Sequence, residues 1–523
     1  MKSSFKKSIK LITLMMAFML VFSACASSSP VKNDPTTASN TTSSTASSTT
    51  AQPTTAPAEP PAELTIGFYM NVNTPKDMQL VIDEVNKILI KDINAKITNI
   101  VALNLGNYID QITLMLSGNE NLDAFLVRPG ANFINYVSRG QVIELDELIA
   151  KYGQGIVKAI GQEFLDAGVV NGKQYGLTTN RDLAKSYGFT IDKSFVDKYN
   201  IDYKNIKSME DMGKAFQTIV EKEPKITPWV SIPGTNALLE WLCKMDNLTD
   251  TYGVLMNYGQ DSKLSVVNLF ETKEYEEQVR VMRDFYQKGY IQKDIMTTSD
   301  SPYDLYRAGT AFAMSTGLKP GLEIQDSMLV GKDLVTATIA PAFTTSTIVQ
   351  TVQWCIARNS KEPEASMKFL NKMYSDPAVT NLLAWGIEGK HYSKKSDGLI
   401  GYPEGVNKDN SGFILNLGWA FGNQFITHVW EGNSPTVWKD TDTFNRSAIK
   451  SNAFGFVYNN SAVKTEVAAV TNVANQYRSG LEFGVLDPDK ALPEFIAKLK
   501  DAGIDKIILE KQKQLDEWLK NKK

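Results

Sequence analysis

Apolar and polar residues alternate with two different periods in the first part of the chain that could form a core. Runs rich in β-branched and aromatic residues predict strands at 64–69, 95–103 and 123–127. Between them, apolar residues spaced three or four apart predict amphipathic helices at 78–89 and 108–116. This βαβαβ order predicts a parallel sheet that helices cover.

In a sheet of this kind, ligands bind beyond the carboxyl ends of the strands. Segments 69–73 and 128–132 follow the first and third predicted strands. We therefore expect these two segments to lie side by side at one edge of the sheet.

Helices are also well marked toward the C-terminal end. Prolines mark the start of two of them, Pro363 and Pro377, and Pro377 follows the N-capping residue Asp376. The expected starts are at Pro363, at Asp376–Pro377, near Pro493 and near Lys506. Residues 405–458 mix aromatics and glycines without a clear period, so we expect irregular structure with short strands there.

The N-terminal residues have the pattern of a lipoprotein signal peptide. Four lysines among the first ten residues precede an apolar run at 11–22, and Ser23, Ala24 and Cys25 follow. Small residues before a cysteine indicate cleavage after residue 24 and lipidation of Cys25. The alternative is a transmembrane helix, but the run is too short to span roughly 30 Å of hydrocarbon. Phe22 stands where a leucine is usual.

Residues 26–61 are mostly Ser, Thr, Ala, Pro, Asn and Gln. Such a segment buries too little apolar surface to fold, so we expect a disordered tether. Together with a palmitate-bearing Cys25, it predicts an extracellular lipoprotein anchored to the outer face of the cell membrane.

The body of the chain, 62–523, is too long for one core, which predicts two lobes. The net charge of −3 and the lack of a basic stripe argue against a nucleic-acid partner. Only two histidines, His391 and His428, are present, so we expect no metal site and no cofactor. Cys243 and Cys355 could form a disulfide or remain buried thiols.

The usual catalytic signatures are missing from the sequence. There is no GxSxG elbow, Walker A loop, GxGxxG turn or HExxH motif. Two SxxK matches, at 447–450 and 461–464, have no KTG partner, and residues 407–412 lack the spacing of a calcium loop. Pairs of carboxylates could support glycoside cleavage, but nothing singles one pair out. We expect no catalytic residues.

Several segments instead resemble the extracellular solute-binding proteins of ABC importers. The similar segments are Leu-Met-Leu-Ser-Gly at 114–118 with Leu-Asp-Ala-Phe-Leu at 122–126, Gly172 to Asp182, Gly-Thr-Ala-Phe-Ala-Met at 309–314, and 356–392. The last segment and the C-terminal 110 residues resemble the sugar-binding-like lipoprotein subgroup that carries a C-terminal domain of unknown function. The resemblance covers nearly the whole chain after the tether.

The resemblance implies an α/β fold of the periplasmic-binding-protein type. This is a clamp of two lobes, each with a sheet flanked by helices, which closes on its ligand about a hinge. By similarity, lobe one comprises 62–180 and 334–384, and lobe two comprises 181–333 and 385–523. Cys243 and Cys355 would then lie in different lobes, where a disulfide would lock the hinge, so we expect two free thiols.

The resemblance also places ligand contacts, by segment. Aromatic faces suit the apolar faces of sugar rings, and polar side chains suit their hydroxyls. Trp241 and Trp518 are assigned to packing instead. The expected ligand-binding residues are Tyr69, Asn71, Arg128, Asn132, Asn180, Arg181, Asp182, Trp229, Asn236, Ser315, Trp354, Trp385 and Glu388.

The expected function is capture of an oligosaccharide by a monomer that delivers it to ABC permease subunits. A peptide or charged small molecule is the alternative ligand, because Arg128 and Arg181 could bind carboxylates. The sequence is also compatible with an extracellular glycoside-cleaving enzyme and with a protein that presents its ligand to a membrane sensor.

Overall fold

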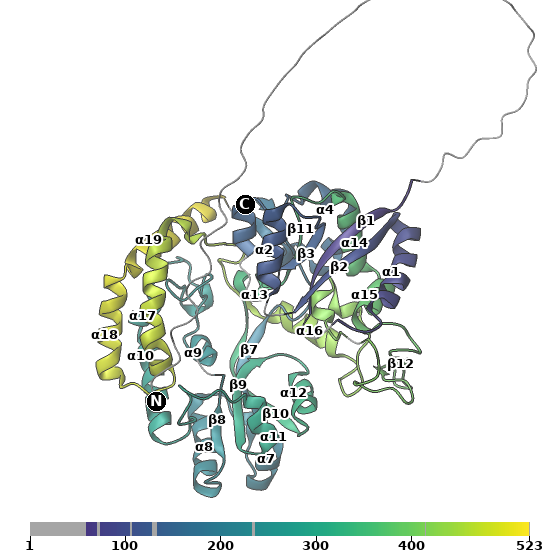
Figure 1. Ribbon diagram of the computed structural model, residues 1–523. Helices are drawn as coiled ribbons and strands as arrows, with labels where there is room; N and C mark the ends of the chain where they lie inside the picture. The colour runs from purple at the N-terminus through teal and green to yellow at the C-terminus, as the bar shows by residue number, and fades with distance from the viewer. Residues whose placement is uncertain are drawn as a thin grey trace, which may run out of the picture. The chain divides into compact units, whose positions relative to one another are not determined.

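Two five-stranded sheets organise the chain, as the computed structural model shows (Figure 1). The structure describes residues 59–70, 74–104, 107–127, 133–232, 236–413 and 415–521. The predicted signal peptide and nearly all of the predicted tether, with Cys25, lie outside the described residues, as do Asn71, Arg128 and Asn132.

The first sheet has the strand order β2-β1-β3-β11-β6. β1 runs parallel to β2 and β3, which confirms the predicted βαβαβ unit, whereas β11 is antiparallel to β3 and β6. The lobe built around this sheet contains β1 (Ala62–Met70), α1 (Met78–Ile93), β2 (Ala95–Asn104), α2 (Tyr108–Gly118), β3 (Ala124–Val127), α3 (Phe133–Ser138), α4 (Asp146–Tyr152), α5 (Gln154–Ile160), α6 (Gln162–Leu165), β4 (Val169–Val170), β5 (Lys173–Gln174), β6 (Leu177–Thr178), β11 (Gln353–Ile356), α14 (Pro363–Ser375), α15 (Pro377–Trp385), β12 (Ser393–Lys394) and β13 (Ile400–Gly401). β4 pairs with β5, and β12 pairs with β13, in two separate two-stranded sheets.

The second sheet has the strand order β14-β10-β7-β9-β8. β7 is antiparallel to β9 and β10, and β8 is parallel to β9. Its elements are β7 (Lys185–Asp192), α7 (Lys193–Tyr199), α8 (Met209–Lys222), β8 (Thr227–Val230), α9 (Ala237–Leu242), α10 (Lys273–Gln287), α11 (Pro302–Ala308), β9 (Ala311–Leu318), α12 (Leu322–Val330), β10 (Leu334–Thr344), β14 (Ile449–Lys450), α17 (Lys464–Glu482), α18 (Pro488–Asp501) and α19 (Ile504–Asn521).

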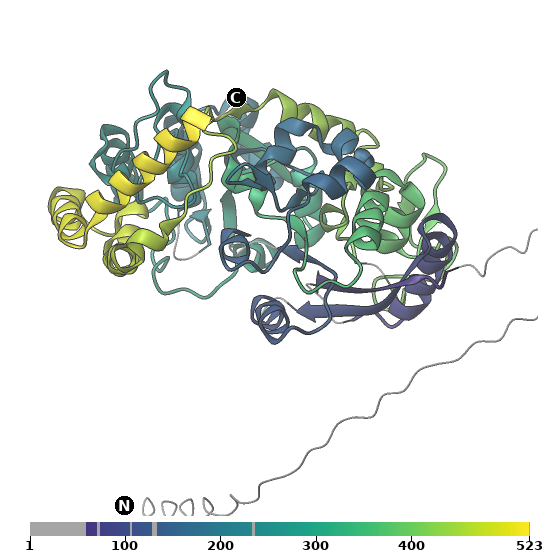
Figure 2. The same cartoon turned by 90° about the horizontal axis from the view of Figure 1, so that it is seen from above.

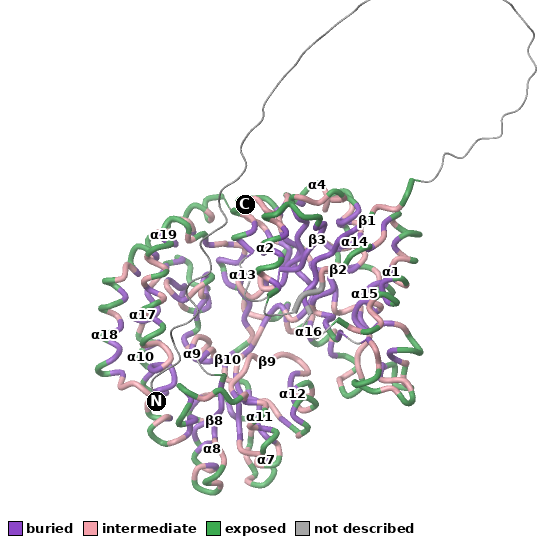
Figure 3. Tube along the Cα trace, viewed as in Figure 1, coloured by how far each residue is buried: buried purple, intermediate pink, exposed green. Residues whose placement is uncertain are grey.

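Each sheet has its own apolar core, so the body has the two lobes that the sequence predicts. Figure 3 shows that the buried residues are concentrated along the strands of the two sheets and on the helices that pack against them. Cys355 lies in the core of lobe one and Cys243 in that of lobe two, and both thiols are free, as expected. Burial raises the pKa of both thiols well above the ordinary range.

Three connections join the lobes. The first runs from β6 to β7, the second from β10 through α13 (Ser346–Gln350) to β11, and the third passes through α16 (Val437–Ser447) to β14. The short 3₁₀ helices are η1 (Asp166–Gly168), η2 (Tyr203–Asn205), η3 (Asn257–Gly259), η4 (Leu269–Glu271), η5 (Gly418–Ala420), η6 (Gln424–Ile426) and η7 (Asn460–Val463).

The lobe boundaries differ from the expected ones at two places. β10 falls within the range expected for lobe one, but it pairs with β7 in the second sheet, so the chain returns to lobe one only after Thr344. Residues that follow α15 fall within the range expected for lobe two, but Tyr392, Phe413 and Phe421 pack into the core of lobe one. The apolar residues of this stretch are irregularly spaced, and packing rather than local pattern decides which core they join.

Local signals predict the C-terminal helices well, except for the start of α18 and the existence of α16. The Asp376 carboxylate accepts the Ala378 N–H and caps α15, as predicted. The expected start near Pro493 is wrong for α18, which begins at Pro488 behind the capping residue Asp487 and contains Pro493. The region expected to be irregular contains α16, whose buried face carries Thr441 and Asn445 instead of an apolar stripe.

The C-terminal helices α17, α18 and α19 pack together on lobe two and lie beside α10 (Figures 1 and 2). The Trp518 ring packs against Phe456 at 6.0 Å between centroids, which confirms its assignment to helix packing. Within the described residues, no helix combines the length and apolar character needed to cross a bilayer.

Candidate functional site

An aromatic surface lies at the carboxyl end of β1 in lobe one. Tyr69 is a buried residue near the end of this strand, and its ring lies 6.2 Å from that of Trp419, at an interplanar angle of 46°. The Tyr69 ring also meets Tyr108 edge to face at 6.0 Å. Tyr108 is fixed by its hydroxyl, which donates to the Leu126 carbonyl at 2.6 Å. Trp419 is only half-buried, so part of its indole remains available to a ligand.

A second aromatic surface lies in lobe two. The rings of Tyr187 on β7 and Trp241 on α9 stack at 5.0 Å and 28°. Phe343, at the end of β10, meets Trp241 edge to face at 5.8 Å. Burial, followed by the charge of Glu240, raises the pKa of Tyr187 to about 12, so its hydroxyl stays protonated. Tyr187 and Trp241 are both half-buried.

Charged side chains gather where the first connection enters lobe two. The Asp182 carboxylate lies 3.4 Å from Arg181 Nη1 and 3.7 Å from Lys319 Nζ. Desolvation would raise the pKa of Asp182, but Lys319, Arg181 and Lys185 together hold it below its ordinary value. Burial lowers the pKa of Lys185, while Asp182 opposes that shift. The cluster can therefore present one carboxylate and two ammonium groups to a polar ligand.

Arg181 and Asn445 tie the three connections together. Arg181 Nη2 donates to the Ile348 carbonyl at 3.1 Å and to Thr351 Oγ1 at 2.7 Å, both on the second connection. Asn445, on the third connection, donates from Nδ2 to the Arg181 carbonyl at 2.6 Å. Its Oδ1 accepts the N–H groups of Leu183 and Ala184, at 2.8 and 3.1 Å. These contacts join the three connections to one another.

The expected ligand-binding residues in the described part of the chain fall into two groups. Six are buried and engaged within the protein: Asn180, Arg181, Trp229, Asn236, Trp354 and Trp385. Tyr69 is buried except for 7% of its surface, and Asp182, Ser315 and Glu388 keep more. Contact of any of these residues with a ligand stays a prediction.

Three of the buried residues have clear structural partners. Trp229 Nε1 donates to Ser315 Oγ at 3.0 Å, and its ring meets Phe189 edge to face. Trp354 Nε1 donates to the Ala420 carbonyl at 2.7 Å. Asn180 Nδ2 donates to Asn423 Oδ1 at 3.0 Å. These side chains hold the lobes and connections in shape.

Glu388 and Trp385 pack around the end of α15 and do not join the charged cluster at Asp182. Glu388 is exposed and pairs with Lys394 at 2.9 Å. Trp385 is 4% exposed, and its ring lies 5.3 Å from that of Trp430. These two residues of the segment 356–392, which resembles the family, therefore belong to lobe one.

Sequence reasoning missed Trp419 and Tyr187 and assigned Trp241 to the core. Trp241 stands among leucines in a short helix, so its pattern is that of a buried residue. Trp419 lies in a stretch without a period, and only the pairing with Tyr69 reveals its place. Tyr187 lies on β7 (Lys185–Asp192), a strand that was not among those predicted from the sequence.

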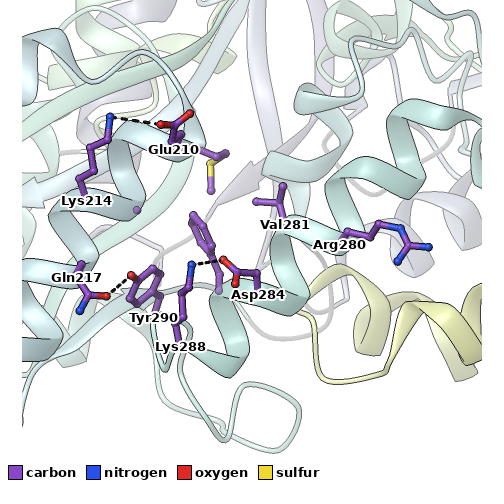
Figure 4. A pocket seen from close by; sticks show the side chains of 11 residues that line it. Glu210, Lys214, Gln217, Arg280, Val281, Asp284, Lys288 and Tyr290 are labelled. Carbon is purple, nitrogen blue, oxygen red and sulfur yellow. Dashed lines mark hydrogen bonds and ion pairs between the residues drawn. The ribbon is translucent and has the colours of Figure 1, made fainter.

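A separate cavity of about 750 Å³ lies between α8 and α10 (Figure 4). Its charged side chains are all paired: Glu210 with Lys214 at 3.6 Å, Asp284 with Lys288 at 2.6 Å, and Arg280 with Glu276 and Asp489 outside the cavity, at 2.8 and 2.6 Å. Because these side chains are engaged in ion pairs, they do not form a set of polar groups directed at one bound ligand. We therefore do not assign the cavity as the ligand site. Among the described residues, no cluster of three or more His, Cys, Asp and Glu could hold a metal ion.

Comparisons with known proteins agree with this architecture. Residues 89–387 match the model of the bacterial extracellular solute-binding proteins, and residues 452–520 match a domain of unknown function (DUF3502). A carbohydrate ABC transporter substrate-binding protein of Streptococcus pneumoniae is 30% identical over 469 residues, which cover 88% of this chain and 91% of the relative.

Solved structures show the same relationship. The crystal structure of the N-glycan transport solute-binding protein NgtS of Streptococcus pneumoniae superposes with a TM-score of 0.78 at 27% identity, covering 88% of this chain and all of that one. Its complex with Man1GlcNAc superposes with a TM-score of 0.68 over the same share of each chain. The family match, the relative and the two-lobed fold together establish that this chain belongs to the bacterial extracellular solute-binding proteins.

Proposed function

We propose that this protein captures an oligosaccharide between its two lobes and delivers it to the permease of an ABC importer. The observation that carries the proposal is the pair of aromatic surfaces, half-buried Trp419 beside buried Tyr69 on lobe one and half-buried Trp241 stacked on half-buried Tyr187 on lobe two. The first surface lies at the carboxyl end of β1, within the parallel part of the first sheet, where ligands of α/β proteins bind. Indole and phenol faces cover the C–H faces of pyranose rings.

The relatives support this choice of ligand. One is named as a carbohydrate transporter component, and NgtS has been crystallised with Man1GlcNAc and with Man5GlcNAc. These relatives are solute-binding proteins rather than enzymes, which supports a binding role without catalysis. The alternative of a peptide ligand loses the support of Arg181, because its fork is bonded to Ile348 and Thr351 within the connections, whereas Arg128 lies outside the described residues.

Closure about the connections is part of the proposal. The three NgtS structures have the same identity to this chain, 27%, but their TM-scores are 0.78 without a named glycan and 0.68 and 0.66 with one. Such a difference is expected when the lobes of one protein change their relation on binding. Hinge closure in this chain would bring the two aromatic surfaces toward a common ligand.

The test is calorimetric titration of the full-length protein with Man1GlcNAc, Man5GlcNAc and a panel of unrelated oligosaccharides. We expect one of these glycans to bind and Trp419→Ala to raise its dissociation constant at least about tenfold, since a central aromatic anchor contributes about 2 kcal/mol or more. Trp518→Ala is the control, because that indole packs on Phe456 in the C-terminal region. Binding of peptides but of no glycan would refute the proposal.

A further inference from the structure

The C-terminal region, 452–520, packs against the segment of lobe two that carries Trp241. Its helix α17 contacts α10, and the turn after α17 approaches the main chain of α10. Arg283 of α10 closes this contact by donating from Nη1 to the carbonyls of Gly484 and Val485, at 2.9 and 3.0 Å. The matched domain has no known role, yet in this chain it borders one of the two aromatic surfaces.

Arg478 of α17 connects this region directly to α9. Its guanidinium donates from Nη2 to Glu240 Oε1, on the residue next to Trp241. It also donates from Nε to Glu482 Oε1 at 2.6 Å and from Nη1 to Thr251 Oγ1 at 3.0 Å. The planar fork fixes three directions at once, which a lysine in this place could not do. One side chain therefore sets the position of α9 relative to α17 and to the loop at Thr251.

A second contact holds the start of α9. Asn236 precedes this helix, is 1% exposed, and donates from Nδ2 to the Glu482 carbonyl at 2.7 Å. A third contact holds the loop that follows: Lys511 of α19, fully buried, donates to Asp250 Oδ1 at 2.7 Å and to the Gly253 carbonyl at 2.9 Å. Both ends of the segment 236–253 are thus bonded to the C-terminal helices.

The energetic character of these contacts favours a positioning role. Burying ions costs desolvation energy, and apolar residues of the same size would often stabilise the packing more. Directional bonds between charged groups instead select one arrangement of the elements that they join. Here the elements joined are α17, the loop at Thr251, and α9 with its indole on Tyr187.

We propose that the C-terminal region braces α9, so that Trp241 stays stacked on Tyr187 and presents a fixed aromatic face to the ligand. Arg478 is the positioning residue of this brace. The consequence for affinity rests on the proposed glycan-binding function, whereas the bracing of α9 does not. Without the brace, binding would have to order α9 first, and that ordering would lower the apparent affinity.

The test compares Arg478→Met and Glu240→Gln in the full-length protein. Glu240→Gln is the milder change, because it leaves the buried Arg478–Glu482 pair in place and removes only the charge on α9. Hydrogen exchange of residues 236–255 should become at least about tenfold faster in both variants, while exchange in β1 and β3 stays unchanged. The dissociation constant for the bound glycan should rise by about tenfold.

Lys506→Met is the matched control, since Lys506 pairs with Glu466 in the same C-terminal region, at 3.2 Å, and is exposed. Wild-type exchange rates at 236–255 in both test variants, or an equal increase in the control, would overturn the brace. Faster exchange with glycan affinity within about twofold of wild type would overturn its link to the ligand. If the wild type binds no glycan, the proposed function fails, and the exchange rates alone decide whether the brace exists.

Discussion

At the scale of single residues, Gly484 allows two main chains to approach more closely than any side chain would permit. It has φ of +71°, and a Cβ atom built on it would lie 2.1 Å from the Met282 carbonyl oxygen on α10. Left-handed backbone is strained for other residues, and here the neighbour is backbone that cannot move aside. The contact between the C-terminal region and lobe two therefore depends on this glycine.

We predict that Gly484→Ala lowers the free energy of unfolding by about 2–4 kcal/mol. Gly289→Ala is the matched control, because Gly289 has φ of +73° but no atom within 4 Å of the Cβ position. Gly289→Ala should lower the free energy of unfolding by only about 1 kcal/mol, the cost of the left-handed conformation alone. Urea denaturation of the three proteins measures both values, and equal losses would show that the close approach is unimportant.

At the scale of elements, α16 shows why part of the fold could not be predicted from sequence. Its buried positions include Thr441 and Asn445, 4% and 3% exposed, which hide the period that marks the other helices. Asn445 is buried because it bonds the main chain of the first connection, a partner far away in sequence. By contrast, α1 carries an apolar stripe and α15 begins at a capping signal of its own, and both were predicted.

We predict that Asn445→Ala lowers the free energy of unfolding by about 2–4 kcal/mol, because it leaves the buried N–H groups of Leu183 and Ala184 without an acceptor. Thr443→Ala, on the same helix and less buried, should change it by less than about 0.5 kcal/mol. Thermal unfolding of both variants tests this. Equal effects would mean that Asn445 does not hold the connections.

The contact between α17 and α9 should make stability depend on pH near neutrality. Desolvation raises the pKa of the fully buried Glu482 to about 7, although Arg478 opposes that shift. The unfolded chain releases this proton near the ordinary value of 4.5, so between pH 4.5 and 7 the native state binds more protons. Stability contributed by this group therefore falls as pH rises through that window, by on the order of 3 kcal/mol.

We predict that Glu482→Gln reduces this fall, so that the difference in unfolding free energy between wild type and variant changes steadily from about pH 5 to about pH 7. The control is Glu494→Gln. Hydrogen bonds from Tyr477 and Lys498 lower the pKa of Glu494, so its contribution is lost only below that window. Its difference curve should be flat over the same range. A flat curve for Glu482→Gln as well would refute the prediction.

At the scale of the whole molecule, the two-lobed class and the βαβαβ unit of the first sheet were predicted from the sequence, but the antiparallel strands β11 and β6 and the ligand surfaces were not. The periods that mark strands and helices are read from neighbouring residues. The βαβαβ order of 62–127 is therefore enough to predict the parallel pairing of its strands. The aromatic surfaces each combine residues far apart in the chain, such as Tyr69 with Trp419. Only the folded arrangement shows that Trp229 and Trp354 are enclosed while Trp241 and Trp419 keep exposed surface.

The proposed delivery to a permease requires that the protein stays at the membrane, and the predicted lipidation of Cys25 would provide this. We predict that Cys25→Ser releases the protein into the medium and abolishes labelling by radioactive palmitate. The binding surfaces lie in the body beyond residue 59, so purified Cys25→Ser protein should bind glycan with wild-type affinity. Uptake of that glycan by cells should nevertheless fall, because a freely diffusing binder is diluted away from the permease.

The control is Ser28→Ala, three residues after the predicted lipidation site, which should leave retention unchanged. Retention of Cys25→Ser at the membrane would contradict lipid anchoring, whereas release without any loss of uptake would contradict the need for an anchor in delivery.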